Sequence, residues 1–191
     1  MMLSYFPSLF WRGTHHRCRG EVMDKLWSPW RSKYIQSFKP GSEKEEGCLF
    51  CRVSKENKDK ENYVLYRGKN SYIIMNLYPY NSGHLMIVPY MHASSLNELD
   101  DETRLDCMNM INTGCEMLGK AIFPHGYNIG ANIGRVSGAG IEDHVHFHIV
   151  PRWNGDTNFM PVLNEVKLIS EFMDETYEKL KNALKEIKPQ G

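Results

Sequence analysis

Three histidines alternate with bulky apolar residues late in this chain, and this alternation constrains the fold more than any other feature. A period of two is typical of a strand and not of a helix. Residues two apart in a strand point to the same face and lie about 6.6 Å apart along it. We therefore expect a strand with a row of imidazoles on one face and apolar packing on the other. The histidines are His144, His146 and His148, and the apolar residues are Val145, Phe147 and Ile149.

This row of imidazoles also indicates a functional site. Near neutral pH an imidazole can act as a nucleophile, a general acid or base, a hydrogen-bond donor to phosphate or a metal ligand. The chain has 8 histidines among 191 residues, so three at this spacing are not expected by accident.

Residues 144–150 follow the pattern His-φ-His-φ-His-φ-φ, with φ apolar, and resemble the signature of the histidine-triad (HIT) family of nucleotide hydrolases and transferases. Residues 83–92 are similar to the family segment Gly-His-x-φ-φ-φ-Pro-x-x-His. Residues 27–31 (Trp-Ser-Pro-Trp-Arg) and 156–159 (Asp-Thr-Asn-Phe) resemble the branch that contains diadenosine tetraphosphate phosphorylases and similar bacterial proteins. The resemblance covers residues 24–160, with its segments in family order.

The expected fold class is α+β, an antiparallel sheet with helices packed on it. Besides the histidine strand, we expect strands at 63–67, 72–76, 84–88 and 127–133, with a hairpin turn at 68–70. Asp100 or Asp101 can cap a helix that runs to about Lys120. Its expected core stripe consists of Leu105, Met108, Ile111, Cys115, Leu118 and Ile122. The resemblance implies a five-stranded sheet that pairs across a homodimer.

The domain organisation predicted from the sequence has three parts. Residues 1–22 form a disordered extension or lie upstream of a functional start at Met23, residues 23–160 form the HIT domain, and residues 161–191 form a C-terminal amphipathic helix packed on it. Apolar positions from Val166 to Ile187 trace that helix at three- and four-residue spacing.

Composition limits the partners. Lys+Arg and Asp+Glu are both 23, so no net positive charge attracts nucleic acid, and no apolar run approaches the ~20 residues that span a bilayer. The five cysteines are an odd number and include a Cys-x-x-Cys pair, which favours a metal site in a reducing compartment over disulfides. We expect a cytoplasmic protein that binds neither nucleic acid nor membrane and uses no organic cofactor.

The resemblance implies roles for the histidines. His146 is the nucleophile that carries a nucleotidyl group, and His148 and His84 steady the phosphate oxygens beside it. Asn76 and Asn132 are at family positions for polar contacts to ribose or phosphate. Gly138 and Gly140 can bring backbone N–H groups close to phosphate.

A second site is indicated by Cys48 and Cys51, two thiolates at a spacing that can bind one zinc ion. Family members with this motif complete the tetrahedron with two histidines, which match His92 and His144 here. Four protein ligands leave no open position, so this zinc would be structural.

One segment departs from the family pattern. Many members have a Gln and a Ser or Thr between the glycine loop and the first histidine, but this chain has Ile141-Glu142-Asp143 there. The hydroxyl or amide contact to phosphate is therefore missing or supplied differently, which fits the phosphorylase-like branch better.

The leading hypothesis is cleavage of dinucleoside polyphosphates through a covalent histidine adduct, with phosphate or water as acceptor. A family alternative is cleavage of phosphoramidate bonds on nucleoside monophosphates. Two rivals from other classes stay open: a catalytic metal site built from the three histidines, and a nucleotide-binding module without catalysis.

Overall fold

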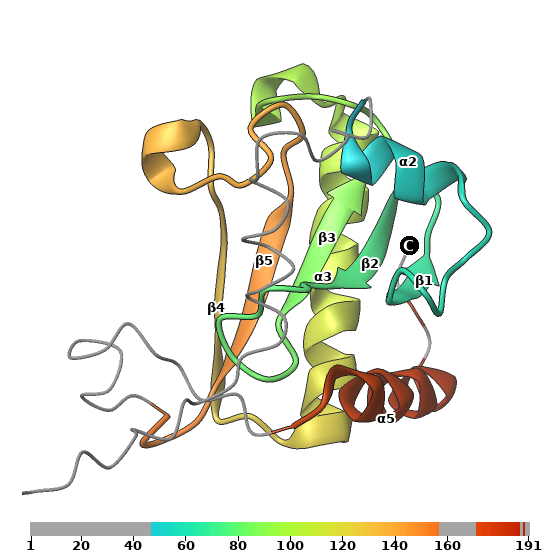
Figure 1. Cartoon of the computed structure of the whole chain (residues 1–191), viewed down its shortest axis with the longest axis vertical. Helices are drawn as coiled ribbons and strands as arrows, with labels where there is room; N and C mark the ends of the chain where they lie inside the picture. Colours follow the sequence, from blue (N-terminus) through green and yellow to red (C-terminus); the bar gives the residue numbers. More distant parts are fainter. Residues whose placement is uncertain (1–46, 157–170, 188, 190–191) are drawn as a thin grey trace, which may run out of the picture.

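The structure, a computed structural model, describes residues 47–156, 171–187 and 189 (Figure 1). The predictions for residues 1–22, for the segment 27–31 and for residues 157–160 lie outside the described residues. Within the described residues, no helix is long and apolar enough to cross a membrane.

Five of the described strands form one antiparallel sheet, as the resemblance implied, and their order is β1-β2-β3-β5-β4. The tight connection between β1 and β2 is closed by Gly68, whose N–H donates to the carbonyl oxygen of Ser71 at 2.9 Å. The strands are β1 (Val64–Arg67), β2 (Ser71–Met75), β3 (Leu85–Pro89), β4 (Gly126–Ala131) and β5 (Phe147–Arg152). The expected α+β class is confirmed.

In the part of the chain that the structure describes, three α-helices pack on this sheet: α2 (Leu49–Lys55), α3 (Asp101–Ile122) and α5 (Met173–Lys185). Short 3-10 turns occur at Leu96–Glu98 (η1) and Arg135–Ser137 (η2). The predicted cap of the long helix is confirmed, because the Asp100 carboxylate accepts the N–H of Thr103 at 2.7 Å. The C-terminal helix begins at Met173, and its expected first positions, Val166 and Ile169, lie outside the described residues.

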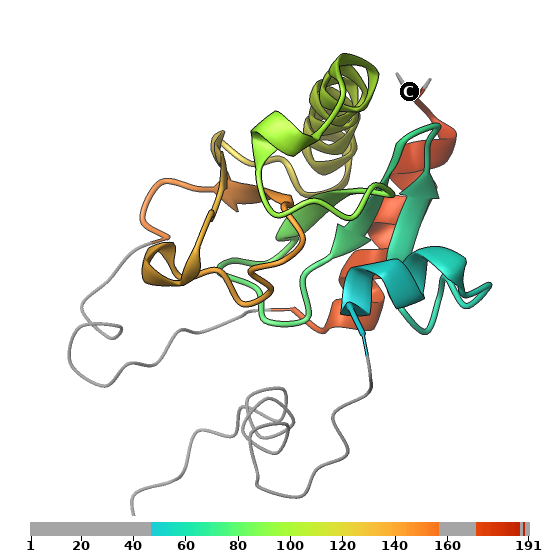
Figure 2. The ribbon, with the colours of Figure 1, turned by 90° about the horizontal axis from the view of Figure 1, so that it is seen from above.

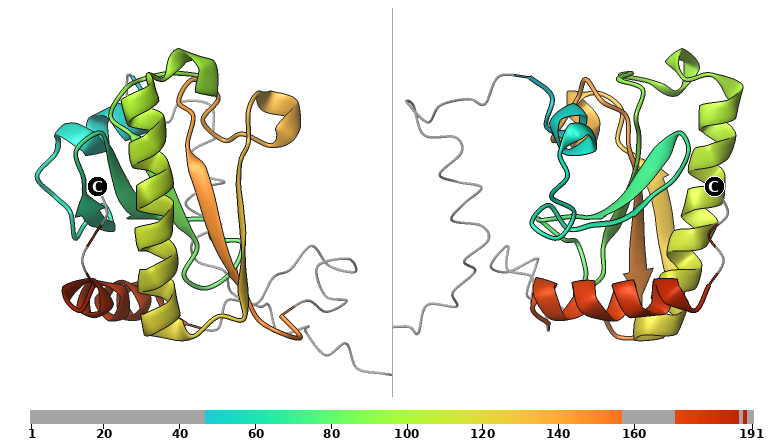
Figure 3. Two further views of the ribbon diagram at one scale, coloured as in Figure 1. Left: turned by 180° about the vertical axis from the view of Figure 1, so that it is seen from behind. Right: turned by 90° about the vertical axis from the view of Figure 1, so that its right-hand side faces the viewer.

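The helices form layers on both faces of the sheet. Helices α3 and α5 cover one face, and α5 crosses near the C-terminal end of α3 (Figures 1 and 3). Helix α2 lies on the opposite face (Figure 2). Alternation along β2 explains both cores, since Ile73 packs toward α3 whereas Tyr72 and Ile74 pack with Phe50 of α2.

The core stripe expected on α3 is partly wrong. Leu105 and Met108 are 62% and 45% exposed, whereas Ile111 and Leu118 are buried as expected. The buried face runs instead through Cys107, Met110, Ile111, Gly114, Met117 and Leu118. Apolar residues occupy more than one face of α3, so periodicity alone did not identify which face the sheet would cover.

The histidine strand starts later than predicted. Strand β5 begins at Phe147, and His144 and His146 lie in the segment that leads into it. Val145 in that segment donates its N–H to the carbonyl oxygen of Ala93 at 2.7 Å, outside the sheet ladder. The alternation still holds, because Phe147 and Ile149 join the core under α3 while the imidazoles lie on the α2 face.

Candidate active site and metal centre

The imidazole of His146 is held so that one ring nitrogen carries no proton. Its Nδ1 lies 2.8 Å from the backbone carbonyl oxygen of His144, which can only accept a hydrogen bond. Nδ1 therefore carries the proton, and Nε2 does not. Burial lowers the pKa of His146, which keeps the ring neutral. An unprotonated Nε2 is the form in which imidazole is nucleophilic.

His84 and His148 form a directed hydrogen-bond chain. The backbone N–H of Tyr80 donates to Nδ1 of His84 at 3.0 Å, so the proton of His84 is on Nε2. That Nε2 lies 3.0 Å from Nδ1 of His148 and donates to it. His148 must then carry its own proton on Nε2. The peptide N–H of Tyr80 thus sets the tautomers of both rings.

The Nε2–H of His148 is a buried hydrogen-bond donor that could bind a ligand. Within the described residues this Nε2 has no hydrogen-bond partner, although buried polar groups are nearly always paired. Burial and the neighbouring His146 lower the pKa of His148 to about 4, so the ring is a neutral donor near pH 7. The rings of His146 and His148 are 4.9 Å apart between centroids. A nucleophilic nitrogen and a hydrogen-bond donor therefore stand side by side, as attack on a phosphoryl group requires.

Asn76 lies next to this hydrogen-bond chain. Its amide nitrogen lies 3.3 Å from Nδ1 of His84, and its Oδ1 accepts the N–H of Tyr78 at 2.9 Å. The second contact fixes which end of the amide faces His84. Asn76 is therefore placed by the turn that follows β2, next to the histidine chain.

The other predicted nucleotide contacts lie after β4. Ala131 pairs with Phe147, and the half-buried Asn132 follows it directly, beside the start of β5. Gly138 is exposed, has a φ of 87° and donates its N–H to the carbonyl oxygen of Arg135 at 3.0 Å. That N–H is thus used within the loop, whereas Gly140 is exposed with open space around its Cα.

Two aromatic residues at the site were not identified from the sequence. The ring of Phe50 is 4.9 Å from that of His146, and the ring of Tyr80 is 4.6 Å from that of His84 and 5.7 Å from that of His148. Phe50 lies inside the Cys-x-x-Cys motif, and Tyr80 lies four residues before His84. Their closeness to these motifs was the only available signal, since neither residue type marks a catalytic site by itself.

A group of hydrogen bonds between polar side chains and the backbone fixes the turn that leads into His84. Asp156 accepts hydrogen bonds from Nε of Arg152 at 2.6 Å and from the amide nitrogen of Asn81 at 2.9 Å. Asn81 also donates to the carbonyl oxygen of Pro151 at 3.0 Å, and its own carbonyl accepts the N–H of His84. The first residue of the segment 156–159 therefore ties the end of β5 to the start of β3.

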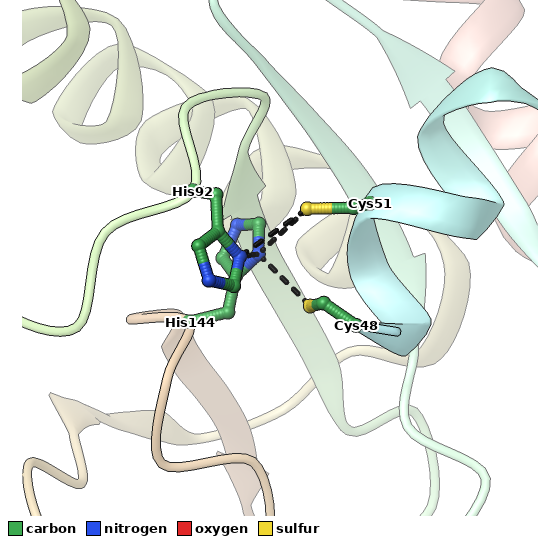
Figure 4. Close-up of side chains that lie close together, drawn as sticks. All are labelled: Cys48, Cys51, His92 and His144. Atoms are coloured by element: carbon green, nitrogen blue, oxygen red, sulfur yellow. Dashed lines mark hydrogen bonds between the residues drawn. The ribbon is translucent and has the colours of Figure 1, made fainter. Parts of the chain in front are cut away.

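The four residues of the predicted metal site come together from three segments of the chain (Figure 4). Cys48 and Cys51 lie at the N-terminal end of α2, His92 follows β3 and His144 precedes β5. One donor atom from each lies within 4.8 Å of the other three. The ring of His144 donates Nε2–H to the carbonyl oxygen of Pro89 at 2.9 Å, which leaves Nδ1 with its lone pair toward the thiols.

The donor distances fit a zinc ion. Around tetrahedral zinc, ligands at about 2.3 Å for sulfur and about 2.0 Å for nitrogen place neighbouring donors about 3.3–3.8 Å apart. Nδ1 of His144 lies 3.2 Å from Sγ of Cys48 and 3.6 Å from Sγ of Cys51. Nδ1 of His92 lies 3.3 Å both from Sγ of Cys51 and from Nδ1 of His144. Two thiols and two imidazoles are also the donor types that zinc prefers.

Protonation at this site works against metal binding. Burial and the neighbouring thiol of Cys48 raise the pKa of Cys51. Metal binding would therefore release protons, as it does wherever thiols become ligands. Because all four positions are protein donors, a bound zinc would tie α2 to the segment before β5 and leave no position for substrate.

Comparisons with known proteins agree with this arrangement. Residues 57–155 match the HIT domain. The chain is 34% identical over 173 residues to the AP-4-A phosphorylase of Mycobacterium tuberculosis, covering 88% of this chain and 87% of that protein. It is 34% identical over 107 residues to the adenosine 5'-monophosphoramidase of Schizosaccharomyces pombe, covering 56% of this chain and 75% of that protein.

Similarity to solved structures points the same way. The crystal structure of a hypothetical histidine triad nucleotide-binding protein from Sulfolobus tokodaii superposes with a TM-score of 0.58 at 29% identity, covering 73% of this chain and 90% of that chain. The match to the HIT domain, the sheet topology and the row of three imidazoles lead to one conclusion. The chain belongs to the HIT family.

Proposed function

We propose that this protein cleaves dinucleoside polyphosphates such as diadenosine tetraphosphate, in the manner of an AP-4-A phosphorylase. The phosphorylase of M. tuberculosis, similar over most of both chains, supports this substrate class. The chemistry is supported by the different protonation of two ring nitrogens on neighbouring histidines. Nε2 of His146 has a lone pair, and Nε2 of His148 carries a proton.

The proposed reaction has two steps. Nε2 of His146 attacks the phosphorus next to one nucleoside, a P–N bond forms and the P–O bond to the rest of the polyphosphate breaks. An oxygen of inorganic phosphate then attacks the same phosphorus, the P–N bond breaks and a nucleoside diphosphate leaves. The Nε2–H of His148 donates to the phosphoryl oxygens, where negative charge gathers in both steps.

The remaining predicted residues bind the nucleotide in this proposal. Asn76 and His84 contact the ribose or phosphate from one side, and Asn132 with the loop of Gly138 and Gly140 contacts it from the other. The contact between Asn76 and His84 supports the first group. The place of Asn132 beside the start of β5 supports the second.

Two alternatives within the family share this site. Water in place of phosphate would make the protein a hydrolase that releases a nucleoside monophosphate. A substrate with a P–N bond would make it a phosphoramidase, and the similarity to the S. pombe enzyme supports that possibility over a smaller part of the chain. A binding module without catalysis would keep the pocket but form no adduct.

The deciding experiment is intact-protein mass spectrometry after brief incubation with diadenosine tetraphosphate, on the wild type and on His146→Ala. A mass gain of one adenylyl group in the wild type only is the expected result. ADP formed with phosphate identifies a phosphorylase, and AMP formed with water identifies a hydrolase. Equal turnover in both proteins, with no adduct, would remove His146 as the nucleophile.

We further propose that the metal held by Cys48, Cys51, His92 and His144 is zinc, and that the protein acts in the cytoplasm. The donor distances support zinc. Thiols that ligate a metal must stay reduced, and the cytoplasm is a reducing compartment.

A homodimer completes the proposal. Strand β4 is at the edge of the sheet, and three exposed apolar side chains, Ile129, Leu105 and Met108, lie on it or on α3. Ile129 pairs with Ile149, whose side chain packs toward α3, so these three lie on the same side of the sheet. An open edge beside exposed apolar groups supports pairing of β4 with β4 of a second copy.

A further inference from the structure

We propose that Phe50 is a positioning residue that holds the imidazole of His146 in its attacking orientation, and that the metal centre keeps Phe50 in place. This inference rests on the proposed function, in which His146 is the nucleophile. It adds a physical link between the metal centre and the histidine site around His146.

Phe50 is fixed firmly enough for such a role. It is 2% exposed and belongs to the core between α2 and the sheet. Its backbone carbonyl accepts the hydroxyl of the buried Tyr72 at 3.0 Å, which ties this turn of α2 to β2. A ring held at its backbone and packed on its faces has few alternative rotamers.

The ring of Phe50 lies against the ring of His146. Their centroids are 4.9 Å apart and their planes are inclined by 59°. His148 bounds the same imidazole with its own ring, 4.9 Å away and inclined by 71°. The hydrogen bond from Nδ1 to the carbonyl of His144 fixes one point of the His146 ring, and the two flanking rings limit its rotation about that point.

The metal centre reaches His146 by two routes. Cys48 and Cys51 flank Phe50 in sequence, so binding of these thiols holds the turn that carries the Phe50 ring. His144 offers Nδ1 to the metal and its carbonyl to His146, and its ring also meets that of Phe50 at 5.5 Å. Loss of the metal would loosen both supports, so it should slow the attack by His146 more than it weakens substrate binding.

The experiment compares Phe50→Leu with Val53→Ala, each in zinc-loaded protein. Val53 is on the same helix, is buried in the same core and carries no aromatic ring, so it controls for loss of packing. We expect Phe50→Leu to lower kcat and the rate of adenylyl-adduct formation by about tenfold to 10²-fold with KM nearly unchanged, because small misplacements of reacting groups cost that much. Zinc content should stay at the wild-type level, and Val53→Ala should keep the wild-type kcat.

Several outcomes would overturn the inference. An equal loss of kcat in Val53→Ala would make the effect one of packing. A raised KM with an unchanged kcat would assign Phe50 to substrate binding, and lost zinc would assign it to support of the metal alone.

A second readout does not depend on activity. At one fixed pH, the imidazole proton signals of His146 should move on Phe50→Leu, and chelation of zinc from the wild type should move them in the same direction. If the His146 signals stay in place after both changes, the inference is overturned. If the wild type forms no adduct, the proposed function fails, and these signals still decide whether Phe50 orders the His146 ring.

Discussion

The neutral state of His148 affects folding as well as chemistry. Burial and His146 lower its pKa from an ordinary 6.5 to about 4, and His84 faces its other nitrogen as a donor. The unfolded chain therefore binds a proton at a pH where folded His148 does not. Stability is full above about pH 6.5 and falls as the pH decreases toward 4. The shift corresponds to at most about 3.5 kcal/mol, at about 1.4 kcal/mol per pH unit.

This predicts a measurable difference for His148→Gln. The free energy of unfolding of the wild type, measured by urea titration between pH 7 and pH 4.5, should fall more steeply than that of the variant, because glutamine does not titrate. Parallel slopes would show that His148 is protonated equally in both states of the chain.

Single residues differ in how far the sequence identified them. The three histidines and the four metal ligands lie at motif positions, and the structure brings them together as expected. Tyr80 orients His84 through its backbone N–H, which no side-chain pattern can reveal. The backbone carbonyls that orient His144 and His146 could not be predicted from the sequence for the same reason.

At the scale of elements, the proposed metal centre lies at the N-terminal end of α2. The helix has seven residues, and no side chain caps its N-terminus. Helices of this length are marginal without other support. The thiols of Cys48 and Cys51 can supply that support through the metal.

We predict that chelation of zinc lowers Tm by about 5–10 °C. A metal present at 100 times its Kd stabilises by about 2.7 kcal/mol, and each kcal/mol corresponds to about 2–4 °C in a chain of this size. Differential scanning calorimetry checks this, with Cys48→Ser as the control on which the chelator should have no effect. An unchanged Tm with lost turnover would instead support a catalytic metal site.

The turn that enters β3 gives a second prediction at this scale. Gly83 has a φ of 76°, and a Cβ there would lie 2.6 Å from Cδ1 of Ile122 and 3.1 Å from Cδ2 of Leu118. Gly134 has a similar φ of 78°, but a Cβ there meets nothing within 4 Å. Gly83→Ala should therefore destabilise by about 1–3 kcal/mol for the backbone and further for the contacts, whereas Gly134→Ala should show the backbone part alone.

Urea denaturation of the two alanine variants measures this difference. Because Gly83 precedes His84, Gly83→Ala should also lower turnover. Equal destabilisation of both variants would show that α3 yields to the added methyl group without cost.

Element positions were more predictable than their boundaries. The hairpin turn and the Asp100 cap are fixed by local chemistry and were predicted. Strand β5 starts at Phe147 because Val145 bonds to Ala93, a contact from a distant segment that period-two alternation does not show. The exposed Leu105 likewise depends on which face of α3 the sheet covers.

For the whole molecule, the open edge at β4 predicts an effect of charge on assembly. Ile129→Glu should weaken a dimer at least about tenfold, since a charge buried at an interface without a partner costs more than 1.4 kcal/mol. Sedimentation equilibrium measures this. Leu96→Glu replaces an exposed apolar residue on η1 and should leave assembly unchanged. A wild-type protein that sediments as a monomer at micromolar concentration would contradict the proposed dimer.

The hydrogen bonds from Tyr80 through His84 to His148 begin at a peptide N–H, which does not ionise near neutral pH. His84 cannot donate its Nε2 proton to His148 and regain a proton at Nδ1, because the peptide N–H that faces Nδ1 does not ionise. His148 can therefore lose its Nε2 proton only by becoming an anion. A departing amine must be protonated to leave readily, whereas a departing polyphosphate leaves as a stable anion. In the proposed mechanism, a hydrogen-bond chain that supplies no proton should therefore favour breaking an anhydride over breaking a bond to nitrogen, and this expected preference follows from the backbone N–H of Tyr80.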